Sequence, residues 1–269
     1  HDTRLMTRQQ YILIGSVTLL FLILYFACET KPPGQQQVEQ SRLLQAEATN
    51  VNVLIREAHD ELPASQLSTI EALQGELSRA VDDSTRVEVL QQLSGRWYEG
   101  GFPAIAGHFA QEIAEIEGGE SAWSIAGTTY AICVQRTNDE KVREFCNQRA
   151  ITAFENAISL NPEEVQHQVN LALTYTEAPP PNEPMKGVLM LRELEQSFPE
   201  SPLVYTTLAQ LAIRTSQFER SIERLNQALE IDPANLNAIC LMAQAYAGAG
   251  NAAEAQRFDQ RCRDMQNEI

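Results

Sequence analysis

The chain has 269 residues, and its hydrophobic content of 43% suffices for a packed core and excludes a disordered tail. Its 36 acidic and 20 basic side chains give a formal charge of −16, which argues against nucleic acid as a partner because phosphate backbones are repelled. The chain has only 13 Gly and 12 Pro. This is too little turn chemistry for an all-β sandwich or barrel, which needs a turn roughly every 8 to 12 residues. We therefore expect a mostly helical chain.

Residues 11–28 form the least polar stretch and are predicted to be a transmembrane anchor. The 17 residues from Tyr11 to Ala27 carry no charge and, as a helix rising about 1.5 Å per residue, just reach across a bilayer core. Arg4 and Arg8 precede this stretch. The positive-inside rule therefore predicts a cytoplasmic segment at 1–10, a linker at 29–37 and export of everything after Cys28.

The same pattern has two alternative interpretations, because a basic segment followed by an apolar run also begins a secretory signal. Tyr25 occupies the first of the small-residue places that signal cleavage needs before Ala27, which disfavours simple secretion. Ala27 and Cys28 match the end of a lipoprotein signal, so acylation of Cys28 stays open. An anchor or an acylated Cys28 would each tether the protein to the cell inner membrane, with the bulk of the chain periplasmic or otherwise extracytoplasmic.

A repeat becomes visible when the chain is aligned on its prolines, since the segment 228–233 echoes 157–162. In register, these segments resemble the tetratricopeptide repeat, a helix-turn-helix unit of about 34 residues with large, small and aromatic residues at fixed places. Small residues are needed where the two helices of a hairpin approach most closely. In the repeat predicted at 202–235 the residues at the fixed places are Tyr205, Leu208, Ala209, Ala212, Ser221, Leu225, Ala228 and Pro233, and of these Ala212 departs from the pattern because it stands at the aromatic place.

Three further copies keep nearly the same phase, at 120–164, 165–201 and, as the last repeat, 236–269. In the first of these, Tyr130 and Ala150 are 20 positions apart, so either its helices or its turn are longer than in the family. In the last copy, Asp259 stands at a large apolar place, as suits a terminal repeat whose outer face meets water. A degenerate copy at 88–119 has four matching residues, namely Gly95, Tyr98, Gly107 and Ala114.

Residues 38–87 have helical patterning without the repeat signature. Pro63 separates two apolar runs, so we expect a helical hairpin that caps the first repeat. The predicted fold class is therefore all-α: an α-α superhelical solenoid of tetratricopeptide repeats with one N-terminal transmembrane helix.

Few residues point to catalysis or to a cofactor. The four histidines, one of them the first residue, do not stand at metal-ligand spacings, so we predict no metal site. The chain has no Gly-rich phosphate loop followed by Lys, and no Cys-x-x-Cys-His site for haem. We expect no enzyme activity, no cofactor and no small-molecule substrate. An enzymatic domain hidden in 38–119 is the alternative.

Four cysteines form two candidate disulfides. Counting outward from the residues expected to face each other within a hairpin brings Cys133 close to Cys146, and the same arithmetic brings Cys240 close to Cys262. The side chain of Cys240 should lean toward the concave surface, and four small core residues are the alternative. Disulfides fit an exported domain.

Members of the family that the repeats resemble bind extended peptides or partner helices on an inner surface lined by their first helices. Only Arg214 could act here as the cationic clamps of the chaperone-binding members do. The set is otherwise neutral and rich in amides, which can satisfy an extended backbone without reading its sequence closely. The resemblance assigns eight residues to this partner-binding groove: Ser124, Thr128, Gln166, Thr206, Gln210, Arg214, Asn237 and Gln244.

The sequence as a whole predicts a membrane-tethered scaffold that binds proteins or extended peptides on the exported side of the membrane. It resembles bacterial envelope proteins of this architecture that assist secretion, outer-membrane assembly or cytochrome c maturation. A fixed accessory subunit of a larger membrane complex is the alternative. Residues 1–28 hold two Arg and one Asp, which leaves a net charge of −17 on residues 29–269. Basic partners should therefore associate faster at low salt than at high salt.

Overall fold

The computed structural model describes residues 50–267, and the prediction of an all-α fold is confirmed over these residues. The predicted segments 1–10, 11–28 and 29–37, with Cys28, and the first part of the predicted cap lie outside the described residues. Within the described part of the chain, no helix has the length and the apolar character needed to cross a membrane. The helices are α3 (Val51–Glu61), α4 (Ala64–Leu77), α5 (Asp83–Glu99), α6 (Pro103–Glu117), α7 (Glu120–Arg136), α8 (Glu140–Leu160), α9 (Val165–Glu177), α10 (Lys186–Ser197), α11 (Pro202–Arg214), α12 (Phe218–Ile231), α13 (Leu236–Gly248) and α14 (Ala252–Asn267).

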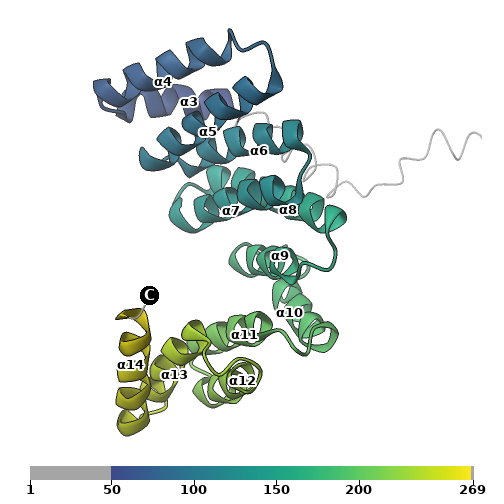
Figure 1. Ribbon diagram of the computed structural model, residues 1–269, viewed down its shortest axis with the longest axis vertical. Coiled ribbons are helices and arrows are strands. Elements are labelled where there is room, and N and C mark those ends of the chain that lie inside the picture. The colour runs from purple at the N-terminus through teal and green to yellow at the C-terminus, as the bar shows by residue number, and fades with distance from the viewer. Residues whose placement is uncertain (1–49, 268–269) are drawn as a thin grey trace, which may run out of the picture. The chain divides into compact units, whose positions relative to one another are not determined.

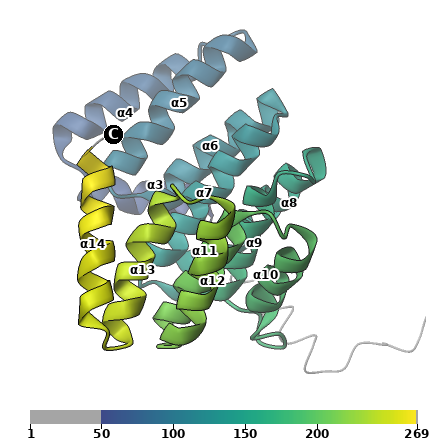
Figure 2. The same ribbon diagram turned by 60° about the horizontal axis from the view of Figure 1, so that its bottom comes forward.

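From α5 onward, successive helices pair as hairpins that stack in chain order (Figure 1). The pairs are α5 with α6, α7 with α8, α9 with α10, α11 with α12 and α13 with α14, and Figure 2 shows them from a second direction. The second helix of each hairpin packs on the first helix of the next. The core is therefore a row of local clusters that each join neighbouring helices, which is the organisation of a solenoid.

The helix boundaries follow from local capping chemistry. The side chains of Asp82, Asp139 and Asn235 accept hydrogen bonds from backbone N–H groups in the first turns of α5, α8 and α13. Pro103 opens α6, where its missing N–H leaves no bond unmade. Gly118 ends that helix with a φ of 65°, a left-handed conformation that favours glycine.

Gly187 shows why the repeat needs small residues where its helices cross. A Cβ atom added at Gly187 in α10 would lie 2.3 Å from the carbonyl oxygen of Ala172 and 2.7 Å from the backbone nitrogen of Thr176, both in α9. These are backbone atoms, which cannot rotate away as a side chain can. The prediction that the small places of a hairpin face each other is confirmed at this crossing.

The hairpin of α7 and α8 contains the extra residues noted between Tyr130 and Ala150. The helices have 17 and 21 residues, and only residues 137–139 separate them. The helices rather than the turn are therefore extended. This gives the hairpin a long internal contact, which includes the side chains of Tyr130 and Phe154.

The register predicted for the degenerate copy at 88–119 is wrong by one residue. Trp97 is fully buried whereas its neighbour Tyr98 is exposed, and Gly95 is exposed too, with nothing within 4 Å of a Cβ atom built on it. The Ser94 hydroxyl, not Gly95, faces α6 and donates a hydrogen bond of 2.9 Å to the carbonyl of Ala106. The larger ring of Trp97 takes the buried aromatic place, and the repeat shifts with it.

The prediction that residues 38–87 form a helical hairpin cap is wrong about which helices pack together and about where the cap ends. The described part of it, α3 and α4, is helical and is broken near Pro63, but these helices hardly approach each other. Instead α3 packs on α6 and α4 packs on α5. Helix α5 begins at Asp83, inside the predicted cap, because Asp82 caps it. Both α3 and α4 thus extend the core of the first repeat, with Ala58 and Ile70 buried in it.

At the other end of the stack, Phe258 supplies the large apolar side chain that Asp259 does not. The Phe258 ring is the buried side chain of α14 and stacks on the Tyr246 ring with centroids 5.6 Å apart. The final helix is therefore turned slightly from its expected register, with Cys262 and Met265 partly buried against the same core and most of its other residues exposed.

Candidate functional site

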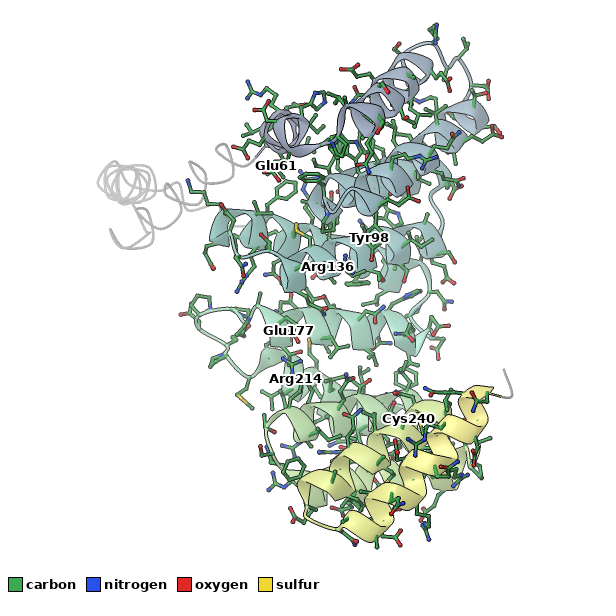
Figure 3. The ribbon with its side chains drawn as sticks, turned by 90° about the vertical axis from the view of Figure 1, so that its left-hand side faces the viewer. Glu61, Tyr98, Arg136, Glu177, Arg214 and Cys240 are labelled. Atoms are coloured by element: carbon green, nitrogen blue, oxygen red, sulfur yellow. A yellow bond between two sulfur atoms is a disulfide. The ribbon has the colours of Figure 1, made fainter. Side chains whose placement is uncertain are left out.

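The first helices of the hairpins, α5, α7, α9, α11 and α13, define one side of the stack, which we call the inner face. In Figure 3 residues near the carboxyl ends of four of these helices follow one another along it, namely Tyr98, Arg136, Glu177 and Arg214. Helix α9 packs directly on α7 and α11, and α11 packs on α13, but the backbones of α5 and α7 hardly approach each other. The inner face is therefore open between α5 and α7.

A pocket of about 500 Å³ occupies this opening, and we call it the α5–α7 pocket. Its floor is formed by Ala110 and Ile113 of α6, and Gly95 and Tyr98 line it from α5. Ile125 lines it from α7 with 61% of its surface exposed. The volume lies within the range of roughly 300 to 1,000 Å³ that is typical of ligand sites.

One stripe of α7 forms the far wall of the α5–α7 pocket. Ser121, Ile125, Thr129 and Ile132 stand three or four positions apart, so they share one face of the helix. Among the described residues that line the pocket, Glu117 is the one with a charged side chain, a carboxylate. The Arg136 guanidinium lies 5.5 Å from the centroid of the Tyr98 ring, a cation–π contact beside the pocket.

A second, smaller pocket of about 140 Å³ lies between α7 and α9, and we call it the α7–α9 pocket. Ile132 lines both pockets, so they adjoin across α7. The smaller pocket also has polar lining residues, since Thr128 and Gln135 of α7 and Asn170 and Glu177 of α9 reach it. Together the two pockets cross three successive first helices.

Arg214 is already paired. Its Nη1 donates a hydrogen bond to Oε1 of Glu177, which ties α11 to α9 on the inner face. A guanidinium held this way has part of its hydrogen-bonding capacity occupied, so the predicted role of Arg214 as a clamp for a terminal carboxylate would require competition with Glu177.

The other predicted groove residues fall into three groups. Thr128 lines the α7–α9 pocket. Thr206 is wrong as a groove residue, because it is buried to 2% exposure and its hydroxyl donates to the carbonyl of Leu203. The remainder lie on the first helices at half-buried or exposed positions outside the two pockets: Ser124, Gln166, Gln210, Asn237 and Gln244.

The sequence analysis missed the α5–α7 pocket. The signal was present in Ile125 and Ile132, two apolar residues seven positions apart, which share one face of the predicted first helix. When the apolar face of a helix is wider than the area that its neighbouring helices cover, the uncovered part is a candidate contact surface for another molecule.

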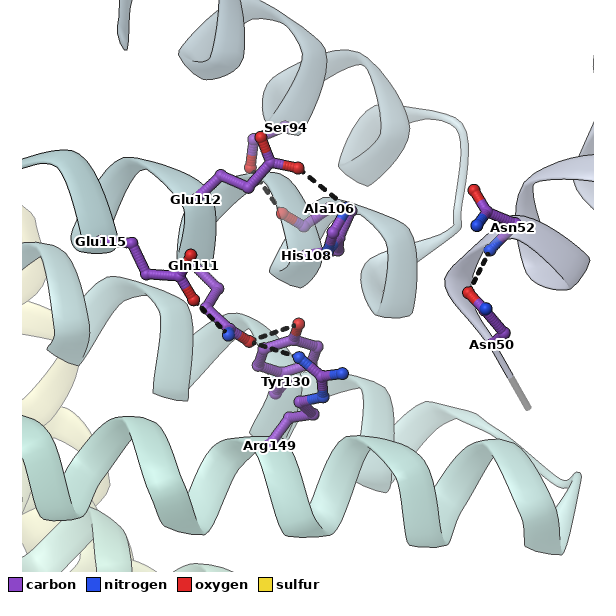
Figure 4. A network of polar contacts seen from close by, with 10 residues as sticks. All are labelled: Asn50, Asn52, Ser94, Ala106, His108, Gln111, Glu112, Glu115, Tyr130 and Arg149. Atoms are coloured by element: carbon purple, nitrogen blue, oxygen red, sulfur yellow. Dashed lines mark hydrogen bonds and ion pairs between the residues drawn. The ribbon is translucent and has the colours of Figure 1, made fainter. Parts of the chain in front are cut away.

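A polar network holds the helices behind the pocket, as Figure 4 shows. The Tyr130 hydroxyl and Nη1 of Arg149 both donate to Oε1 of Gln111, at 3.1 and 3.0 Å. The Gln111 amide in turn donates to Glu115 at 2.7 Å. Burial raises the pKa of Tyr130, so this hydroxyl keeps its proton and remains a donor. The network fixes α6 to α7 and α8.

Glu112 gives the molecule a pH-dependent contact, also drawn in Figure 4. Its Oε1 lies 3.0 Å from Nε2 of His108, and this hydrogen bond holds the pKa of Glu112 below its ordinary value of 4.5. Ionised Glu112 therefore stabilises the fold above about pH 4.5, and this contribution is lost as the pH falls through the folded-state pKa. We expect Glu112→Gln to lower the free energy of unfolding near pH 7 but not near pH 2.

Chemical denaturation at both pH values would measure this difference. Glu71→Gln, an exposed carboxylate of α4, is the matched control. A loss in Glu112→Gln that was as large in acid as at neutral pH would contradict the assignment.

The structure joins Cys133 to Cys146 and Cys240 to Cys262, the two pairs that were expected to lie close together. The Cα atoms are 6.1 and 5.0 Å apart. Each disulfide links the two helices of a single hairpin, α7 with α8 and α13 with α14. The Cys133–Cys146 pair is buried, whereas Cys240 and Cys262 are half-buried.

Removing either disulfide should destabilise its hairpin. The closed loops span 13 and 22 residues, for which loss of the cross-link costs about 3 kcal/mol. We expect this loss in chemical denaturation of Cys133→Ala/Cys146→Ala and of Cys240→Ala/Cys262→Ala. Non-reducing peptide mapping of the wild-type protein checks the pairing itself, and four free thiols would refute it.

Stacked helical hairpins with a pocketed inner face define an α-solenoid, a class of repeat protein. A family model, the tetratricopeptide repeat, matches residues 203–235, which contain α11 and α12. Residues 203–235 are therefore a tetratricopeptide repeat, and the pattern predicted at 202–235 is confirmed. Its eight quoted residues except Pro233 are buried there.

Solved structures offer looser similarities. MamA from its residue 41 to its end, from Desulfovibrio magneticus RS-1, is 16% identical with a TM-score of 0.42, over 70% of this chain and 97% of its own. YrrB, described as a TPR protein with an unusual peptide-binding site, is 14% identical with a TM-score of 0.38, over 74% of this chain and 94% of its own. Superpositions this loose carry no argument about function. No curated protein sequence matches the chain.

Proposed function

We propose that this protein is a membrane-tethered scaffold that binds an extended protein segment on its inner face, on the exported side of the membrane. The observation that carries the proposal is the pair of adjoining pockets across α5, α7 and α9. They leave apolar surface such as Ile125 open to solvent on the side of the stack formed by the first helices. Surface of this kind marks a site of interaction with another molecule.

The polar groups beside the pockets suit a peptide backbone. The amides of Gln91, Gln135 and Asn170 each carry both a donor and an acceptor, and an extended segment presents both along its length. Recognition by amides is tolerant of sequence, which fits a scaffold with several clients. We include in this proposal that the scaffold acts in envelope protein assembly or secretion.

Two features support the exported location and the tether. Disulfides persist in oxidising compartments and are rare in the cytosol, so the two bridges favour the extracytoplasmic side. The apolar residues 11–28, preceded by arginines, favour attachment to the inner membrane with that orientation. Mass spectrometry of the mature protein tests the tether, and a chain beginning at Glu29 would refute both the anchor and the acylated form.

Site-specific photo-crosslinking in the native membrane tests the binding role. A crosslinking amino acid at Gln135, in the α7–α9 pocket, should capture partners, whereas the same group at Glu155, on the exposed side of α8, should capture few. Many partners identified by mass spectrometry favour the scaffold. One stoichiometric partner favours a fixed accessory subunit, and equal capture at both positions would contradict binding on the inner face.

A further inference from the structure

We propose that the α5–α7 pocket is the anchor site of the scaffold, which takes one bulky apolar side chain from an extended segment with basic flanking residues. This inference rests on the proposed function and names the chemistry of its partner. It concerns the larger of the two pockets, in which the sequence analysis placed no groove residue.

The lining of the pocket selects an apolar side chain. Ala110 and Ile113 form its floor, and Ile125 and Ile132 form its wall on α7. Ile125 keeps 61% of its surface in water, an unfavourable position for a side chain of its size in a well-ordered helix. Covering it with an aromatic or large aliphatic side chain removes this exposed surface, and interface anchors of this kind supply most of the binding energy at protein contacts.

The shape of the pocket favours an extended segment. Its wall on α7 runs from Ser121 to Ile132, which is about 16 Å along a helix that rises roughly 1.5 Å per residue. Five residues of extended chain, at about 3.3 Å each, cover that length. The α7–α9 pocket adjoins this wall across α7 at Ile132 and offers polar groups such as Gln135 and Asn170.

The charge around the pocket favours basic flanking residues. Glu117 is the charged residue that lines it, and the exported residues 29–269 carry a net charge of −17. An acidic segment would meet repulsion from both, whereas Lys or Arg beside the anchor would be attracted. The Arg136 guanidinium lies over the ring of Tyr98, 5.5 Å from its centroid.

Gly95 gives a direct way to close the pocket. It lines the pocket from α5, and a Cβ atom built on it meets nothing within 4 Å. Gly95→Leu should place its side chain in the space that the anchor needs, while Gly95→Ala leaves most of that space open. Both substitutions replace an exposed helical glycine by a better helix former, so both variants should melt at or above the wild-type temperature.

Selection from a random library of linear 12-residue peptides displayed on phage, against the full-length protein in detergent, tests the inference. We expect enriched peptides to carry Phe, Trp, Leu or Met within a few positions of Lys or Arg. Synthetic copies should bind Gly95→Ala within about twofold of wild type and Gly95→Leu at least tenfold more weakly. Glu117→Gln should weaken them more at low salt than at high salt.

The outcomes separate this inference from the proposed function. If the selected peptides bind Gly95→Leu as tightly as wild type but lose affinity with Thr128→Lys in the α7–α9 pocket, the scaffold stands and the anchor site is refuted. Enriched peptides that are acidic or lack a large apolar residue refute the anchor chemistry. A library that yields no binder, when both Gly95 variants are folded, counts against the anchor and the peptide-binding function together.

Discussion

Trp97→Ala should cost about 4 kcal/mol in the free energy of unfolding, while Tyr98→Ala, one position along the same helix, should cost far less. Trp97 is fully buried in the core that joins α3, α4, α5 and α6, and its loss leaves a cavity that the surrounding helices cannot fill by local movement. Tyr98 is exposed at 36% and lines the α5–α7 pocket, so its removal should weaken peptide binding rather than stability.

Urea denaturation of both variants, together with affinity for a selected peptide, measures the two effects. The pair is its own control, because each is an aromatic residue on α5 replaced by alanine. Equal losses of stability in the two variants would mean that the register of α5 is not the one described.

Gly187→Ala is the second substitution for which we expect a large effect, a destabilisation of about 3 kcal/mol. The added methyl group would meet the carbonyl oxygen of Ala172 and the nitrogen of Thr176, so α9 and α10 would have to move apart. The gain of about 1 kcal/mol that alanine normally brings to a helix is too small to offset this overlap.

Gly95→Ala makes the same chemical change in the opposite environment. Nothing lies within 4 Å of its Cβ, so here the gain in helix propensity should appear as a higher melting temperature. Calorimetry of the two variants compares them directly. A Gly187→Ala protein as stable as wild type would show that the crossing of α9 and α10 is looser than described.

The hairpins could be predicted from the sequence because their residue types are imposed by contact geometry. Gly187 and Ala172 face each other at a distance that larger side chains do not allow, and a Cβ atom built on Gly127 would likewise lie 2.7 Å from the Phe154 ring. The copy at 88–119 was misaligned because Trp97 and Tyr98 are adjacent aromatics and either satisfies the pattern. Only the packing of α5 on α6, through Ser94 and Ala106, decides between them.

The candidate site was less predictable, because the α5–α7 pocket depends on the spacing between helices. The resemblance to the family placed Thr128 in the groove but could not show that the backbones of α5 and α7 stay apart, which is a tertiary property. Thr206 failed for a related reason. The corresponding place lines the groove in the family that the repeats resemble. Here the Thr206 hydroxyl donates a hydrogen bond to the Leu203 carbonyl in the same helix, so the residue can be buried without an unpaired polar group.

The placement of the disulfides also has a mechanical consequence. Each bridge stiffens one hairpin, and neither crosses from one repeat to the next. Between them, the contact of α10 with α11 is the smallest of those that join successive hairpins, and two ion pairs, Glu177 with Arg214 and Glu195 with Arg224, span the same junction. We therefore expect a pulling force to change the spacing and twist between the hairpins α9–α10 and α11–α12 before any hairpin opens. Rising salt weakens the two ion pairs at this junction, so small-angle scattering should detect a change in the dimensions of the stack. Dimensions that did not change would argue for a rigid junction.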